Sequence, residues 1–279
     1  MKIRLLSFVL ITAFSASAYP QAGAAQSNPA ENSGAPNTFS GLSQDLKTKV
    51  EQLGNLQRDF GRGMNSPGVE LSLKELGRTR ASDRTLVKYG LYATGLPEDK
   101  TYTLFQVQLD GSLIKNMEGV GLDGAGRAIC PGRPGTCRGN GPNDPIDLIV
   151  FAGKSEPKRF ALIAEDDSHL KSFVSVVPFP NEKKDKNCKL ESIIGTPNGE
   201  LMFVQASGFE PNADVDIDSQ SYSEKHHEVG RTTSEGSLFS AVLPSVKGKK
   251  SGKTTWQVTA KSCSPKLAFQ WGEGSYHLE

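Results

Sequence analysis

The residues best suited to bind a metal or transfer a proton lie in one short run that contains Glu224, His226, His227 and Glu228. Adjacent imidazole and carboxylate groups can bind a transition metal, and histidine titrates close to neutral pH. The run falls between two predicted strands, so we expect a solvated loop at the tip of a hairpin. Because neighbouring side chains of an extended strand point to opposite faces, His226 and His227 could share a metal only where the backbone turns. These four residues are the candidates for a metal site, and a plain hairpin tip is the alternative.

Three aspartates alternate along the predicted strand that precedes this run: Asp214, Asp216 and Asp218. Alternation places their carboxylates on one face of the strand. Like charges on one face repel unless water or a bound cation such as calcium lies between them. We expect a solvent-facing surface here, with a calcium site as the alternative.

Other charged runs have simpler interpretations. Residues 165–169, Glu-Asp-Asp-Ser-His, lie between two predicted strands and are interpreted as a hairpin turn, since no partner nucleophile can be named. The basic run 247–253 is typical of a solvent-exposed loop, and contact with an anionic polymer of the cell envelope is the alternative. No Gly-x-Ser-x-Gly elbow, His-Glu-x-x-His helix or phosphate-binding loop occurs in the sequence. We therefore expect no catalytic residues and no cofactor.

The two tryptophans are expected in different surroundings. Trp256 alternates with Val258 and Ala260, which predicts a core position. Trp271 lies near the end of the chain and is expected to be partly exposed, where its ring could stack on a sugar. Trp271 is thus the candidate ligand-binding residue, although closing the end of a core is the commoner role for such a ring.

The N-terminus has the pattern of a signal peptide. Lys2 and Arg4 precede an apolar run over 5–14, and small residues follow at 15–18, which predicts cleavage after Ala18. The apolar run is shorter than a bilayer span requires, and an uncleaved anchor is the alternative. We expect export to the periplasm or the cell exterior, with no membrane span after signal cleavage.

The cysteines agree with export. All four, Cys130, Cys137, Cys188 and Cys263, follow the predicted signal peptide. An even number in an oxidising compartment predicts two disulfides with three possible connectivities. The tight Gly- and Pro-rich loop from Cys130 to Cys137 favours local closure, which leaves Cys188 to join Cys263 and staple the first and last strands of a C-terminal module. A zinc site is the alternative, although no Cys-x-x-Cys pair is present.

Composition favours a turn-rich β protein. Among 279 residues there are 29 glycines and 16 prolines, and hydrophobic residues make up 36%. That apolar share can bury a core and is too small for a protein embedded in a membrane. The 32 basic and 31 acidic residues leave a net charge of +1, which argues against nucleic acid as a partner.

Period-two alternation of apolar residues begins near residue 67 and predicts short strands separated by turns, so the fold class is all-β with two β-sandwich domains.

The helical spacing of apolar residues over 41–62 predicts an amphipathic helix that packs on its own domain, with a docking or oligomerisation helix as the alternative. A domain boundary is expected over 178–186, where two prolines restrict the backbone and charged side chains keep the segment exposed to solvent. The predicted segments are a signal peptide (1–18), a disordered linker (19–40), the helix (41–62), a first sandwich (66–180), a second sandwich (186–271) and a frayed tail (272–279).

The two predicted sandwiches carry related turns. Residues 93–99 align with residues 206–212, and each segment follows one strand and precedes another. A Gly turn and a strand come about 30 residues later in both cases. A tandem duplication explains this similarity, and chance is the alternative because such turns are common between strands.

Residues 207–217, 234–239 and 242–244 resemble tandem bacterial immunoglobulin-like modules of exported proteins, which often have Gly-Phe-x-Pro-Asn before a strand and Asp-Gly-x-Phe later. Here Ser-Glu-Gly stands at 234–236, where an aspartate-containing turn is more usual. The resemblance is clearest over 186–271 and weaker over 67–180. It implies immunoglobulin-like sandwich domains and an exported setting, and it implies no active site.

We therefore expect an exported, non-catalytic binding or scaffold protein of the bacterial cell envelope, with an envelope protein or a polysaccharide as partner. The first alternative is a metal-dependent or carbohydrate-active extracytoplasmic module. The second is a subunit of a secretion or surface-layer assembly that docks through the helix at 41–62.

Overall fold

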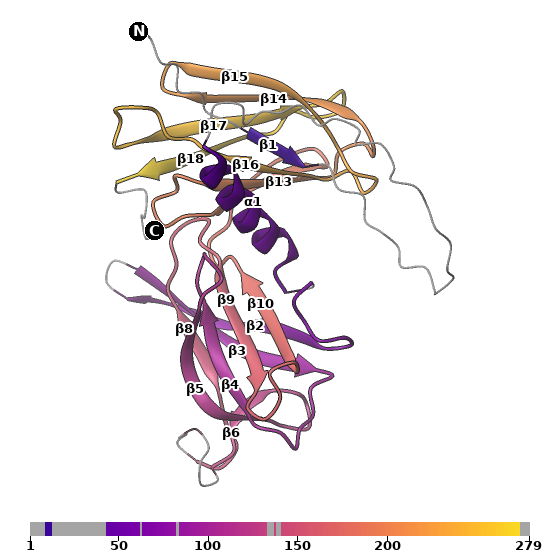
Figure 1. Ribbon diagram of the computed structural model, residues 1–279, viewed down its shortest axis with the longest axis vertical. Coiled ribbons are helices and arrows are strands. Elements are labelled where there is room, and N and C mark those ends of the chain that lie inside the picture. The colour runs from indigo at the N-terminus through magenta and orange to yellow at the C-terminus, as the bar shows by residue number, and fades with distance from the viewer. Residues whose placement is uncertain are drawn as a thin grey trace. The chain divides into compact units, whose positions relative to one another are not determined.

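The computed structural model describes residues 9–12, 43–61, 63–81, 84–132, 137 and 141–273 (Figure 1). Within them the chain consists of antiparallel sheets and one helix, which confirms the all-β class. No helix in these ranges is long and apolar enough to cross a bilayer. The predicted linker over 19–40 lies outside the described residues, as do most of the predicted signal peptide and of the predicted tail.

The described chain divides into two compact units. The first unit comprises Lys49–Asn181 and Ile193–Gly199. The second unit comprises Glu182–Ser192 and Glu200–Glu273, together with the described residues up to Thr48.

The first unit contains a three-stranded sheet of order β2-β3-β8 and a six-stranded sheet of order β10-β9-β4-β5-β6-β7. Its strands are β2 (Glu70–Ala81), β3 (Arg84–Thr94), β4 (Tyr102–Val107), β5 (Leu113–Leu122), β6 (Ala128–Cys130), β7 (Asp144–Pro145), β8 (Asp147–Val150), β9 (Lys158–Ala164) and β10 (Lys171–Val176).

The second unit contains a four-stranded sheet of order β15-β14-β17-β18 and a five-stranded sheet of order β1-β16-β13-β12-β11. Its strands are β1 (Val9–Thr12), β11 (Asn181–Asp185), β12 (Cys188–Ile194), β13 (Met202–Ser207), β14 (Asp214–Ser221), β15 (Glu224–Arg231), β16 (Leu238–Val242), β17 (Ser251–Thr259) and β18 (Lys266–Gly272). Strand β1 falls within the predicted signal peptide. Strand β11 forms where the sequence predicted only a wet boundary, because its backbone joins the edge of a sheet while most of its charged side chains stay exposed.

The two units repeat one strand order. In the first, β2-β3-β8 form one sheet and β5-β4-β9-β10 lie side by side in the other; in the second, β12-β13-β16 and β15-β14-β17-β18 do the same. These seven strands of each unit correspond one to one along the chain, so the same path is traced twice, while β1 and β11 occur in the second unit alone. Strands β6 and β7, which flank the Cys130–Cys137 loop, are an addition to the first unit.

Glycines at matching turns have the same role in both units. Gly95 follows β3 with φ +76°, and a Cβ built on it would lie 2.2 Å from the carbonyl oxygen of Gly68. Gly208 follows β13 with φ +79°, and its Cβ would lie 2.0 Å from the carbonyl oxygen of Asn187. Both positions require a left-handed backbone and a close approach of two chain segments, which only glycine allows without strain. The alignment of 93–99 with 206–212 thus corresponds to equivalent turns.

Apolar side chains that alternate along the strands fill the core of each unit. In the first unit Val87, Leu91 and Leu162 are fully buried. In the second unit β14 alternates strictly between exposed and buried positions, and Ile217 lies on its buried face. Trp256 is fully buried, which confirms its predicted core position.

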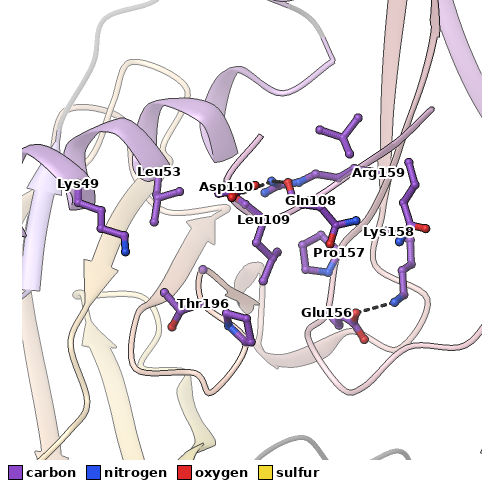
Figure 2. A pocket seen from close by; sticks show the side chains of 14 residues that line it. Lys49, Leu53, Gln108, Leu109, Asp110, Glu156, Pro157, Lys158, Arg159 and Thr196 are labelled. Atoms are coloured by element: carbon purple, nitrogen blue, oxygen red, sulfur yellow. Dashed lines mark hydrogen bonds and ion pairs between the residues drawn. The ribbon is translucent and has the colours of Figure 1, made fainter. Parts of the chain in front are cut away.

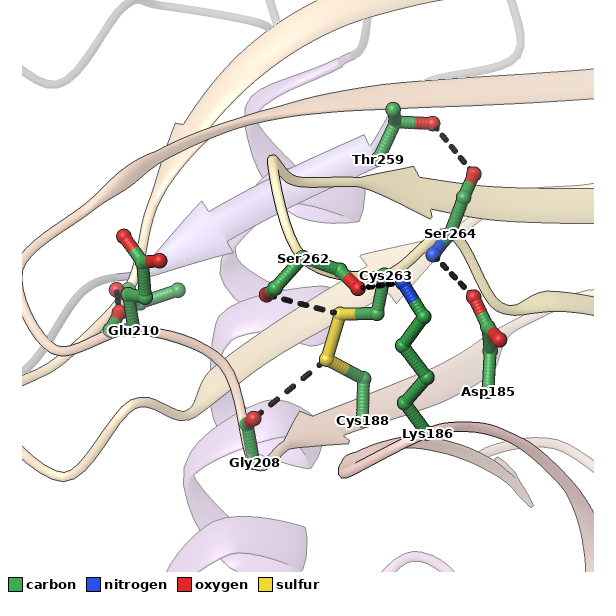
Figure 3. Close-up of a disulfide and its surroundings, with 10 residues drawn as sticks. Asp185, Lys186, Cys188, Gly208, Glu210, Thr259, Ser262, Cys263 and Ser264 are labelled. Carbon is green, nitrogen blue, oxygen red and sulfur yellow. Dashed lines mark hydrogen bonds between the residues drawn. A yellow bond between two sulfur atoms is a disulfide. The ribbon is translucent and has the colours of Figure 1, made fainter.

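Two disulfides join Cys130 to Cys137 and Cys188 to Cys263, the pairing that the sequence favoured. Figure 3 shows the second of these. Cys188 begins β12, and Cys263 lies in the turn between β17 and β18, so the bond connects the two sheets of the second unit. Disulfides persist in oxidising compartments, so this pair of bonds indicates a location outside the cytosol.

The helix α1 spans Gln44–Asp59. Its first turn is capped by Ser43, whose Oγ accepts a hydrogen bond from the backbone N–H of Leu46 at 3.3 Å. Beyond the helix, Phe60 packs edge-on against Phe173 of β10, with ring centroids 5.9 Å apart. This contact belongs to a small apolar cluster on one face of β4, β9 and β10, and the end of α1 thereby lies against the first unit.

Candidate functional site

The predicted metal-binding run lies in a strand, and the expected loop is wrong. Glu224, His226, His227 and Glu228 all belong to β15, which pairs with β14 along its whole length. The chain turns just before it, at Tyr222, whose φ is +52°. Pairing with β14 satisfies the backbone groups on one side of this edge strand, and this outweighs the preference of its charged side chains for a loop.

The strand separates the two histidines. Glu224, His226 and Glu228 are partly buried on one face of β15, whereas His227 is exposed on the other. Burial raises the pKa of Glu228 to about 7 and lowers the pKa of His226 below its usual value. Across the described ranges, no three histidine, cysteine or acidic side chains are arranged to hold a metal ion.

The exposed face of the same sheet brings His227 to the predicted aspartates. The Nδ1 of His227 lies 3.0 Å from Oδ1 of Asp218, and its Nε2 lies 3.8 Å from Oδ1 of Asp216. Asp214 lies 3.7 Å from the guanidinium of Arg231 on the same strand pair. The aspartates thus share one solvent-facing surface, and basic side chains of β15 lie beside them. All these groups are more than half exposed, so each pair contributes little to stability.

Trp271 does not offer a surface for sugar stacking. Its side chain is only 2% exposed, and its indole N–H donates to the Oγ of Ser221 at 3.2 Å. The expectation of a partly exposed ring is wrong because Tyr222 packs edge-on against it, with ring centroids 6.4 Å apart. Trp271 therefore closes the end of a core, the alternative that the sequence left open.

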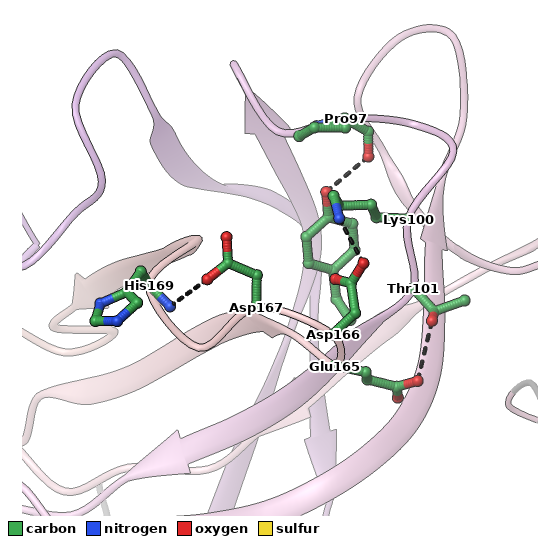
Figure 4. Close-up of polar contacts among 8 residues, drawn as sticks. Pro97, Lys100, Thr101, Glu165, Asp166, Asp167 and His169 are labelled. Carbon is green, nitrogen blue, oxygen red and sulfur yellow. Dashed lines mark hydrogen bonds and ion pairs between the residues drawn. The ribbon is translucent and has the colours of Figure 1, made fainter.

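The acidic run over 165–169 forms the turn between β9 and β10, as expected (Figure 4). Glu165 accepts hydrogen bonds from the backbone N–H of Gly119 at 2.7 Å and from the hydroxyl of Thr101 at 3.0 Å. These bonds hold the pKa of Glu165 below its usual value. Asp166 pairs with Lys100 at 2.5 Å. The carboxylates thus tie neighbouring strands of the first unit together.

A pocket of about 390 Å³ opens in the first unit, at a place that sequence reasoning did not single out. Its wall comes from four segments far apart in the chain (Figure 2): Lys49 and Leu53 of α1, the end of β4 with the turn after it, the start of β9, and the loop after β12. Asp110 lies in the turn after β4, where its carboxylate accepts hydrogen bonds from the N–H and the hydroxyl of Ser112. Charged and apolar groups therefore face one cavity, which is the usual composition of a ligand site.

An ion pair lies at one side of this pocket. Glu156 accepts a hydrogen bond from the backbone N–H of Gly153 at 2.7 Å and pairs with Lys158 at 2.5 Å. Both side chains are largely buried, with 11% and 14% exposed. Their opposite charges neutralise each other, so the pair shapes the wall without adding net charge.

Arg159 is the most deeply buried charged side chain of the pocket wall, with 2% of the residue exposed. One Nη2–H donates to the side-chain oxygen of Gln57, and Nη1 lies 3.4 and 3.3 Å from the carbonyl oxygens of Gln108 and Leu109. The guanidinium also lies over the ring of Phe60, 4.8 Å from its centroid. Burial lowers the pKa of Arg159 to about 10, so the side chain remains charged at neutral pH.

No protein-family model and no curated protein matches this chain. The features of this chain that bear on function are therefore the two units themselves and the pocket in the first unit.

One signal in the sequence could have pointed to this pocket. Arg159 directly precedes an apolar run, and in a strand its side chain lies on the same face as Ala161 and Ile163. A charge on that face is costly if both faces of the strand are covered. The sequence does not reveal which strands are covered on both faces. That β9 pairs with both β4 and β10 and lies next to the end of α1 is a tertiary property.

Proposed function

We propose that the protein is an exported, non-catalytic binding protein of the cell envelope, built from two immunoglobulin-like modules that arose by duplication. The repeated strand order and the matching glycine turns support the duplication. A sandwich of a three-stranded and a four-stranded sheet with shared chain order is typical of immunoglobulin-like domains. The two disulfides support an oxidising location.

The observation that carries the binding role is the pocket in the first unit. Segments from α1, β4, β9 and the loop after β12 converge on it, so its shape depends on the complete fold of that unit. Such a preformed, partly apolar cavity with a few fixed polar groups suits a small ligand or one end of a larger one. The envelope supplies candidates of both kinds, namely small solutes and the ends of polysaccharide or peptide chains.

The test is a ligand screen followed by thermal unfolding of the purified protein. A ligand that binds only the folded state raises the unfolding midpoint by mass action. The panel holds peptidoglycan fragments, envelope polysaccharides and small organic solutes. We expect at least one member to raise the midpoint in the wild type.

Two variants of the loop after β12 locate the binding. Thr196 lines the pocket, and Thr196→Trp should fill it and abolish the shift. Asn198, two residues further along the same loop, is exposed and lies outside the pocket wall, so Asn198→Trp should keep the shift. A shift that survives Thr196→Trp, or no shift with any panel member, would contradict this function.

A further inference from the structure

Arg159 is a buried cation whose close partners are all neutral. They are the side-chain amide of Gln57, two backbone carbonyl oxygens and the ring of Phe60. No described carboxylate forms an ion pair with it, and its Nε–H has no hydrogen-bond partner in the described structure. Burying a charge without a counter-charge is costly, because the protein interior replaces water poorly as a solvent for ions.

The arrangement of the N–H groups of Arg159 determines which kind of ligand it can bind. A guanidinium has five N–H donors, and the Nε–H and one Nη2–H point from the same edge of its plane. Nε makes no bond here, and Nη2 spends one of its two donors on Gln57. The Nε–H is thus without a described partner, and arginine binds the two oxygens of a carboxylate through two parallel hydrogen bonds, one from Nε and one from Nη2.

The other charges of the pocket do not supply that counter-charge. Glu156 is engaged by Lys158 at 2.5 Å. The carboxylate of Asp110 accepts from Ser112, and Lys49 exerts a further electrostatic attraction on it. Among the charged residues of the wall, three are basic and two acidic (Lys49, Lys158 and Arg159 against Asp110 and Glu156), which leaves one positive charge.

We propose that the pocket binds the carboxylate group of a small organic ligand, which pairs with the Nε edge of Arg159. This rests on the proposed binding function and names the chemistry of its ligand. The two Nη1 contacts at 3.4 and 3.3 Å are long, so a small turn of the guanidinium towards an entering anion gives up little. The same side chain also connects β9 to α1 through Gln57, and that structural role accounts for Nη2 but leaves Nε without a partner.

The test follows the Arg159 Nε–H signal by proton–nitrogen NMR of the purified protein. Sodium acetate and sodium succinate are titrated, with sodium chloride at matched ionic strength and acetamide as the neutral analogue. We expect a saturable shift with at least one carboxylate and none with chloride or acetamide. A shift of the same size with acetamide, or no saturable shift with either carboxylate, would overturn the proposal.

Two substitutions assign the effect to the guanidinium. Arg159→Lys keeps the charge but removes the fork, so the carboxylate that shifts the wild-type signal should bind about tenfold more weakly, measured by calorimetry. The matched control is Arg58→Lys, because Arg58 lies on α1, donates to Asn55 at 2.7 Å and is not part of the pocket wall. Equal affinities of wild type and Arg159→Lys would also overturn the proposal.

Gln57→Ala keeps the test valid if Arg159→Lys fails to fold. It removes the acceptor that competes for Nη2, so carboxylate affinity should rise several-fold. Unchanged or weaker binding would mean that Arg159 only holds α1. A panel ligand that is lost in Thr196→Trp but is indifferent to Arg159→Lys would leave the binding function standing and refute the carboxylate assignment alone.

Discussion

The guanidinium of Arg159 lies 4.8 Å from the centroid of the Phe60 ring, and the same ring packs edge-on against Phe173. Phe60 thus connects the end of α1 to two neighbouring strands, β9 and β10. One aromatic side chain supports both a wall of the pocket and the small apolar cluster on β4, β9 and β10.

Phe60→Leu should destabilise the first unit. The substitution keeps an apolar side chain but removes the ring contacts to Arg159 and Phe173, which together contribute about 1–2 kcal/mol. Differential scanning calorimetry measures the change as a lower unfolding midpoint. Leu46→Ala is the control, because Leu46 is exposed on the same helix and should change stability by less than about 0.5 kcal/mol. Equal effects of the two substitutions would refute this role of Phe60.

The two disulfides should differ in their contributions to stability. The Cys188–Cys263 bond spans 75 residues and the Cys130–Cys137 bond spans 7, so loop entropy predicts contributions of about 4 and about 2 kcal/mol. Both tryptophans lie in the second unit, so fluorescence reports its unfolding in urea. Replacing Cys188 and Cys263 with serine should lower that midpoint strongly, whereas the Cys130 and Cys137 replacements should leave it almost unchanged. A larger fluorescence effect of the shorter loop would contradict the assignment.

Gly208→Ala should cost far more than Gly248→Ala. Both glycines have φ +79°, but a Cβ at Gly208 would lie 2.0 Å from the carbonyl oxygen of Asn187, whereas a Cβ at Gly248 meets nothing within 4 Å. The left-handed backbone alone costs about 1 kcal/mol, so Gly248→Ala measures that part. The clash forces the backbone apart and should add roughly 2 kcal/mol or more at Gly208. Urea unfolding of both variants checks the difference, and similar values would mean that the close approach relaxes freely.

Glu228 should make stability depend on pH. Its pKa is raised to about 7 from an ordinary 4.5, mainly by burial, while His227 acts in the opposite direction. The folded state therefore holds the proton of Glu228 more tightly than the unfolded state does. The contribution of the protonated carboxyl to the free energy of unfolding is fully present below pH 4.5 and is lost as the pH rises through 7. Glu228→Gln removes the titrating group. We expect the variant to be more stable than the wild type at pH 8 by roughly 1 kcal/mol, after allowing for solvent screening, and nearly equal at pH 5. A constant difference across that range, measured by urea unfolding, would contradict the shift.

The alternation of apolar residues determined much of the fold. Period-two patterns around Leu71, Val215 and Trp256 specified strands with one buried face, because the side-chain period of a strand is two. The Gly- and Pro-rich loop from Cys130 to Cys137 favoured local closure, which left the other pair by elimination. Local chemistry was sufficient for the strands and for the shorter disulfide loop, because each of these depends on residues close together in the sequence.

Partner strands determined what the sequence could not. Glu224 to Glu228 carry the charges of a loop but form a strand, because β14 pairs with it along its whole length. Trp271 is buried because Tyr222 and Ser221, far away in the chain, cover its ring and accept its indole N–H. The pocket is the clearest case, since Arg159 acquires its partners from the end of α1 and from the turn after β4. Burial of a charge arises from contacts between distant segments, so only the tertiary structure could decide it.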